Sequence, residues 1–263
     1  MNAPLASDQD IPIRSFTGRV FDDLRAVRAF DVRTVIAGGG VTVLLVVLLA
    51  LDLTAIVSDV LATAAKHLDL LSHDDAANLF RLDTEYGISA YYGYAKLFAT
   101  AGLLALLSRQ RQSRAFALLA TVFFYAALDD SLLLHERAGR ALASLDPMGL
   151  FAGTFGHGLA EAAYFGVVGL AILGLLAAAV RTVAGPDRPA VLILTGLMLV
   201  IGFCAVAVNL MEAALADISR IAMKALSLAD DGGELVASTL ALVLSAGLAR
   251  AARVDRMQKP PSA

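Results

Sequence analysis

Six apolar segments, each close to the length that crosses a bilayer as an α-helix, constrain this chain more than any other feature. A helix rises about 1.5 Å per residue, so about 20 apolar residues span the hydrocarbon core. The chain is 58% apolar and 17% charged, whereas soluble domains are about 45–50% apolar and about 25% charged. We therefore predict an all-α polytopic membrane protein. The predicted transmembrane helices are residues 34–57, 86–107, 115–134, 157–180, 190–215 and 234–248.

The rest of the composition excludes several functional classes. A net charge of −3 does not indicate nucleic-acid binding. A single cysteine, Cys204, excludes an internal disulfide and any Cys-x-x-Cys motif, and we expect it to pack as a small apolar residue. Neither a phosphate-binding loop nor a nucleophile-elbow motif occurs. The expected partner is the lipid bilayer, and the oligomeric state is left open.

The segments between and outside the predicted spans suggest three regions. Residues 1–33 combine arginines with an apolar stripe, so we predict an amphipathic segment on the cytoplasmic surface, with no cleavable signal peptide. Residues 34–249 are predicted to form the six-helix domain, and residues 250–263 a basic cytoplasmic tail. Connections 58–72 and 213–228 have helical apolar spacing and are predicted to be short helices along the outer interface.

Basic residues give the predicted orientation. Most of the 21 Lys and Arg residues lie in the N-terminal segment, the second and fourth connections, and the C-terminal tail. Positively charged segments stay on the cytoplasmic side, so both termini are predicted to be cytoplasmic in the cell inner (plasma) membrane. All four histidines, and the carboxylates within or at the ends of the spans, then lie toward the outer side.

This shared depth predicts one polar site in the outer half of the bundle. An ionisable group near the bilayer centre costs roughly 2.5–3.5 kcal/mol, so such groups normally face the interior and mark function. Helix spacing supports convergence, because residues four or seven apart share a face, as do His157 with Glu161 and Asp129 with Glu136. The candidate metal ligands are Asp129, His135, Glu136, His157, Glu161, Glu212 and Glu234, and the further polar-site candidates are Asp52, Glu85, Lys96 and Asp130.

Lys96 is unusual because it lies well inside the second predicted span. A lone ammonium group is strongly disfavoured at that depth. We expect Lys96 to extend toward Asp129 or Asp130 and form a buried ion pair. A neutral lysine is the alternative.

The third predicted span ends in Leu-Asp-Asp-Ser-Leu-Leu-Leu-His-Glu at residues 128–136. This motif resembles a family of uncharacterised multi-pass bacterial membrane proteins, which have Leu-Asp-Glu, four residues and then His-Glu at the end of a span. Residues 80–85 and 230–234 also look like that family. The chain differs at Asp130, where the family has Glu, and at Lys96, where the family has an apolar residue. The resemblance implies a multi-pass fold and brings no activity.

Four functional hypotheses remain open. Iron, manganese or zinc held by the histidines and carboxylates would offset their mutual repulsion and would act on a lipid-like or membrane-surface substrate. An ion-coupled transporter or proton relay uses the same residue types, although the polar residues do not extend to the cytoplasmic side. Haem between His135 and His157 is a third hypothesis, and a sensor or structural role with a solvated pocket is the fourth. The metal site is favoured, and whether the protein is an enzyme stays open.

Overall fold

The computed structural model describes residues 18, 22–23, 25, 27, 30–67, 82, 87–146, 149, 151, 153–183, 185–208, 211 and 220–258. Within these residues all regular structure is helical, with eight α-helices, one 3-10 turn and one π-helical turn. The elements are α2 (Val32–Ile36), α3 (Gly39–His67), α5 (Ile88–Arg111), α6 (Arg114–Leu132), α7 (Leu134–Ser144), α8 (Gly153–Thr182), η1 (Gly185–Asp187), α9 (Arg188–Phe203), η2 (Cys204–Val208) and α11 (Arg220–Gln258).

Five helical stretches in the described part of the chain are long and apolar enough to cross a membrane. Large apolar side chains on the outside of the bundle support this setting, since Val43, Leu53, Val167 and Leu170 are 61%, 61%, 74% and 71% exposed. Such surfaces suit lipid rather than water. The all-α, multi-pass membrane fold is thus confirmed. The five stretches are Gly39–Ala64, Arg114–Leu132, Gly158–Thr182, Gly185–Val206 and Lys224–Gln258.

Helix α5 corresponds to the second predicted span but is not among those five. Its three tyrosines and Lys96 make it more polar than its neighbours. It packs against both α6 and α11, and Leu104 and Leu107 on it are fully buried. The count of six spans therefore stays a prediction.

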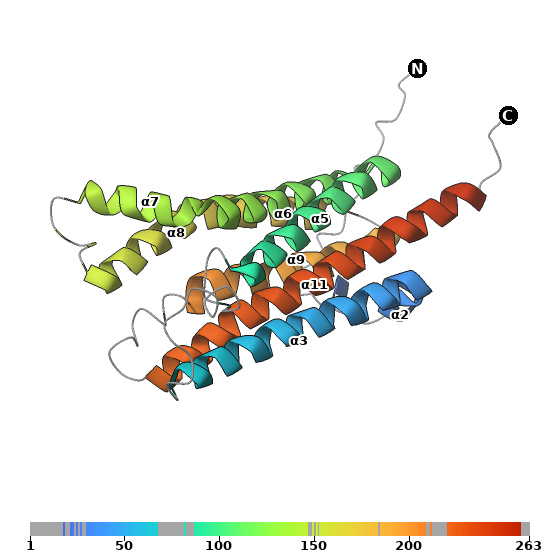
Figure 1. The fold of residues 1–263 in the computed structure, drawn as a ribbon. Helices are drawn as coiled ribbons and strands as arrows, with labels where there is room; N and C mark the ends of the chain where they lie inside the picture. The colour runs from blue at the N-terminus through green and yellow to red at the C-terminus, as the bar shows by residue number, and fades with distance from the viewer. Residues whose placement is uncertain are drawn as a thin grey trace, which may run out of the picture.

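The long helices run along a common axis, with α11 at the centre of the packing (Figure 1). Helix α11 packs against α3, α5 and α9, while α6 packs against α5, α8 and α9. Helix α7 continues beyond α6 at one end and packs on α8. At the opposite end lie α2, the turn between α5 and α6, and the C-terminal end of α11 (Figure 1).

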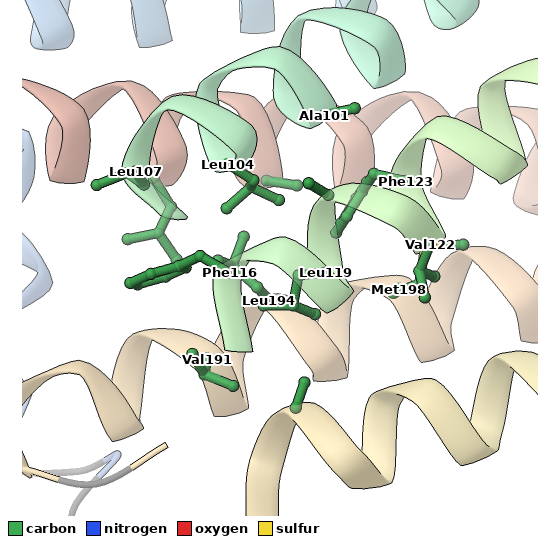
Figure 2. Packing of buried hydrophobic residues seen from close by; sticks show 14 of the residues in the cluster. Ala101, Leu104, Leu107, Phe116, Leu119, Val122, Phe123, Val191, Leu194 and Met198 are labelled. Atoms are coloured by element: carbon green, nitrogen blue, oxygen red, sulfur yellow. The ribbon is translucent and has the colours of Figure 1, made fainter. Parts of the chain in front are cut away.

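The apolar core lies where α5, α6 and α9 meet (Figure 2). Leu104, Phe116, Leu119, Phe123 and Leu194 are fully buried there. Lipid tails are as apolar as these side chains, so the packing is held by van der Waals contacts rather than by expulsion of water. This well-packed half leaves the polar residues to the other half of the bundle.

Basic residues gather at the end of the bundle that holds the α5–α6 turn. Arg111 forms an ion pair with Asp187 of η1. Arg256 of α11 donates from Nη2 to the carbonyl oxygen of Gln110 over 2.8 Å. The basic second connection, fourth connection and C-terminal helix end therefore meet, as the predicted orientation requires. Which side of the membrane this end faces stays a prediction.

Two predicted interfacial helices are wrong in their described parts. Residues 58–67 of connection 58–72 continue α3, and residues 220–228 of connection 213–228 begin α11. In the continued part of α3, the carboxylate of Asp59 is paired inside the bundle instead of lying at the interface. Asp59 is fully buried, and its Oδ1 accepts from Lys224 Nζ over 3.0 Å and from the Leu82 N–H over 3.3 Å.

The chain ends are described only in part. The predicted amphipathic segment 1–33 lies mostly outside the described residues. Helix α11 continues through Gln258, so the predicted tail 250–263 begins as a helix that extends the last span. Cys204 is buried and free, in keeping with its expected packing role.

Candidate metal site

A left-handed residue separates α6 from α7 and sets the geometry of the site. Leu133 has φ 50° and ψ 47°, a conformation that costs a residue other than glycine roughly 1–2 kcal/mol. Its N–H points to the carbonyl oxygens of Asp129 and Asp130, which closes α6. On a continuous helix, residues six apart lie on different faces. The turn at Leu133 brings His135 back onto Asp129.

The predicted face pattern of the third span is therefore wrong in one respect. A continuous helix predicts Asp129 and Glu136 on one face, and on such a helix Asp130 and His135 would lie on opposite sides of that face. In the structure α6 ends at Leu132, after Asp129 and Asp130 and before His135 and Glu136. Asp129, Asp130 and His135 come together instead.

Asp129 is buried, and each of its oxygens has a protein partner. It is 4% exposed. The Tyr164 hydroxyl donates to Oδ1 over 2.7 Å, and Nδ1 of His135 lies 3.0 Å from Oδ2. The Tyr164 hydroxyl also forms a hydrogen bond with that of Tyr125. These contacts satisfy a carboxylate that would be costly to bury alone.

The His135 ring is held between a carboxylate and an aromatic ring. It stacks on Phe165 with ring centroids 5.3 Å apart and an interplanar angle of 27°. Burial lowers the pKa of His135, but the hydrogen bond to Asp129 and the charges of Asp129, Asp130 and Glu161 together raise that pKa above its usual value of 6.5. Because Nδ1 faces Asp129, Nε2 is the ring nitrogen left for another partner.

Asp129, Asp130 and His135 form a group that can hold a metal ion. Each offers one ligand atom, and these atoms lie within 4.8 Å of one another. Two carboxylates and an imidazole are typical ligands for zinc, manganese and iron. A divalent cation would also offset the repulsion between the two adjacent carboxylates. The residues present fit a metal ion.

A cavity of about 260 Å³ adjoins this group. Helices α5, α6, α7, α9 and α11 form most of its walls, and Leu82 and Leu133 complete them. Asp130 and His135 line it, whereas Asp129 does not. Its lining contains no Lys or Arg among the described residues, so the cavity attracts cations. The lining carboxylates are Asp130, Glu136, Asp231 and Glu234.

Two other candidates lie beside the group but outside it. Glu136 lines the cavity, and its Oε2 is 3.2 Å from Nη1 of Arg140 one helical turn away. Glu161 is 8% exposed and packs against Gly139, where an added Cβ would lie 2.7 Å from Glu161 Cγ. Glycine thus permits the close approach of α7 to α8. Glu161 is near enough to influence the charge of His135.

Lys96 forms a buried ion pair as expected, but with Asp52 rather than with Asp129 or Asp130. Its Nζ lies 2.9 Å from Asp52 Oδ1, with the two side chains 2% and 1% exposed. Asp129 and Asp130 were expected because they lie at a similar depth in the membrane. Asp52 is the partner because α3 and α5 both pack against α11, and depth along the helices does not reveal this packing.

The remaining contacts of Lys96 close this network. Nζ also donates to the carbonyl oxygen of Leu235 over 2.7 Å and to Thr239 Oγ1 over 3.1 Å. Thr239 Oγ1 in turn donates to Asp52 Oδ2 over 2.7 Å. The ammonium group also lies 4.3 Å from the centre of the Tyr92 ring. Every polar atom of the pair is therefore engaged within the protein.

Three candidates lie outside the described side chains. These are Glu85, His157 and Glu212. Their metal-binding roles, and the second axial ligand of the haem hypothesis, stay predictions. Glu234, by contrast, lines the cavity together with Asp130.

The predicted site residues do not include several residues of the observed site. Tyr164 continues the predicted row of His157 and Glu161, and Asp231 lies three residues from Glu234, but neither is among the predicted site residues. Tyr125 lies four residues before Asp129 on α6, so i, i+4 spacing was a signal for it too. Leu133 had no such signal, because left-handed turns are usually marked by glycine or asparagine.

Fold and site together define a polytopic helical membrane protein with a buried carboxylate–histidine group beside an acidic cavity. The chain belongs to a family described as a domain of unknown function (DUF8692), whose profile matches residues 39–248. The match contains the whole candidate group and the helices that surround the cavity. It agrees with the resemblance to an uncharacterised multi-pass family, while the bacterial source remains a prediction. No curated protein and no solved structure matches the chain.

Proposed function

We propose that this is an integral membrane protein that binds one divalent metal ion on the Asp130 and His135 side of the group formed by Asp129, Asp130 and His135. The metal, iron, manganese or zinc, would act on a lipid-like or membrane-surface ligand that enters the adjoining cavity. One observation carries the proposal: two carboxylates and an imidazole offer ligand atoms within 4.8 Å of one another beside a cavity of about 260 Å³.

The charge distribution supports a cation rather than an anion in this position. The cavity wall carries carboxylates on α6, α7 and α11 and no Lys or Arg among its described residues. Lys96, whose α5 neighbours Gly93 and Leu97 line the cavity, is already paired with Asp52. A bound cation would therefore supply the positive charge that the protein itself does not provide.

The chain's own residues would have defined tasks around such an ion. Asp130 and His135 would bind it at the cavity wall, and the apolar parts of the lining, such as Leu97 and Ile201, would hold the body of a ligand. A bound divalent ion supplies Lewis acidity and an activated water. Because the lining combines carboxylates with apolar residues, ligands with a polar head and an apolar body fit best.

The predicted topology belongs to the same proposal. Helix α5 would cross the membrane with the five apolar helices, and the basic end of the bundle would face the cytoplasm of the cell inner membrane. Reporter fusions after Arg111 and Arg188 should read cytoplasmic, and fusions near Gly153 and Leu226 should read external. The reverse pattern would move the metal site to the cytoplasmic half.

Elemental analysis tests the metal proposal. Protein purified in mild detergent without added metal should carry close to one equivalent of iron, manganese or zinc. The Asp130→Asn, His135→Ala double variant should lose it. Asp255→Asn, an exposed carboxylate near the far end of α11, serves as the matched control and should retain it. A metal-free wild type that gains no thermal stability from added metal would reject the proposal and favour a transporter or a solvated pocket.

A further inference from the structure

The three residues of the candidate group differ in their relation to the cavity. Asp130 and His135 line it. Asp129 does not line it and is 4% exposed. A metal ion that meets a ligand in the cavity must lie on the cavity side of the group, which is the side of Asp130 and His135.

Asp129 also has both of its oxygens committed. Oδ1 accepts from the Tyr164 hydroxyl over 2.7 Å, and Oδ2 lies 3.0 Å from Nδ1 of His135. An imidazole that faces a carboxylate through Nδ1 keeps its proton there and turns Nε2 outward as an acceptor. Metal-binding histidines are commonly oriented in this way by a carboxylate.

We propose that Asp129 is a positioning residue rather than a metal ligand. It holds the Nδ1–H of His135, and Tyr164 holds Asp129, so that Nε2 of His135 and the carboxylate of Asp130 face the cavity. The effect on metal binding rests on the proposed metal site. The orientation of His135 is testable without metal.

Aromatic packing supports the same orientation. The His135 ring stacks on Phe165 at 5.3 Å, and the Tyr164 ring meets the edge of Phe165 at 5.6 Å and 69°. Tyr164 and Phe165 are neighbours on α8. One helix therefore fixes both the ring plane of the histidine and the carboxylate that selects its tautomer.

The tyrosine pair offers a matched control. The Tyr164 hydroxyl donates to Asp129 over 2.7 Å and also meets the Tyr125 hydroxyl, whereas Tyr125 reaches Asp129 mainly through Tyr164 and interacts with it more weakly. Tyr164→Phe and Tyr125→Phe each remove one hydroxyl from half-buried tyrosines. The proposal requires the first to disturb His135 more than the second.

The metal-free test uses ring ¹⁵N chemical shifts of labelled histidine at alkaline pH, with His135→Ala identifying the His135 signal. The wild type and Tyr125→Phe should show His135 protonated on Nδ1. Asp129→Asn should show a mixed or reversed tautomer, because an amide also donates to the ring. A wild-type ring protonated on Nε2, or an unchanged tautomer in Asp129→Asn, would overturn the inference.

The metal test uses zinc affinity together with the number of zinc ligand atoms from X-ray absorption. Loss of an orienting carboxylate typically costs about 10–100-fold in affinity, so Asp129→Asn and Tyr164→Phe should bind zinc more weakly with an unchanged ligand set. Asp130→Asn should lose a ligand. If Asp129→Asn loses a ligand as Asp130→Asn does, Asp129 is a ligand and the inference is wrong. If the wild type shows the Nδ1 tautomer but binds no zinc, only the proposed metal function fails.

Discussion

Two buried polar clusters lie in this bundle and differ in how their charged groups are satisfied. In the cluster between α3, α5 and α11, Lys96 meets Asp52 at 2.9 Å, and Thr239 bridges to the second carboxylate oxygen. In the cluster between α6, α7 and α8, Asp129 meets His135 at 3.0 Å. The first is closed on all sides by protein, while the second adjoins a cavity through Asp130 and His135.

Under the proposed metal function, the first cluster has a structural role and the second a ligand-binding one. A closed network with matched charges ties three helices together and leaves no atom for a ligand. An open group with more carboxylates than cations is incomplete without a partner. The strained turn at Leu133 lies in the second cluster, as expected where geometry is held for function at some cost in stability.

The largest expected effect comes from the closed network. Lys96→Met leaves Asp52 as an uncompensated buried carboxylate and should lower the free energy of unfolding by about 3–5 kcal/mol. Thermal or denaturant unfolding in mild detergent measures the change. Adding Asp52→Asn should restore part of the loss, and purely additive losses in the double variant would show that the pair is not coupled.

A smaller effect of opposite sign is expected at the open group. In metal-free protein, Asp130→Asn removes repulsion from the neighbouring Asp129 and should raise the free energy of unfolding by roughly 1 kcal/mol, as substitutions at incomplete functional sites often do. Glu136→Gln is the control. Glu136 pairs with the exposed Arg140, and such pairs contribute little, so this substitution should change the free energy of unfolding only slightly. A loss in Asp130→Asn as large as that in Lys96→Met would remove the distinction between the clusters.

The smallest effect concerns the two left-handed residues. Gln112, in the turn between α5 and α6 at the basic end, has φ 50° like Leu133 but is exposed. Gln112→Gly should raise stability by about 0.5–1 kcal/mol, because glycine adopts this conformation without strain. A midpoint shift in the same unfolding assay reports it. If Gln112→Gly is no more stable than the wild type, the left-handed conformation at Gln112 is not strained. The turn at Leu133 would then give no evidence of strain held for function.

Much of the fold could be predicted because apolar length and helical periodicity are local properties. The predicted spans overlap α3, α5, α6, α8, α9 and α11, and Asp129 with His135 were recognised as site residues. The break at Leu133 could not be predicted, since a leucine carries no turn signal. The partner of Lys96 could not be predicted either, because its contact with Asp52 spans 44 residues and depends on how α3 packs against its neighbours.

Anomalous diffraction from crystals grown with zinc or manganese tests most directly whether the open group, and not the closed one, binds metal. We expect one strong peak at the cavity wall, bonded to Nε2 of His135 and to Asp130 at about 2.0–2.2 Å, with Asp129 turned toward Nδ1. No peak at that position, or a peak bonded only to Asp231 and Glu234 of α11, would contradict it.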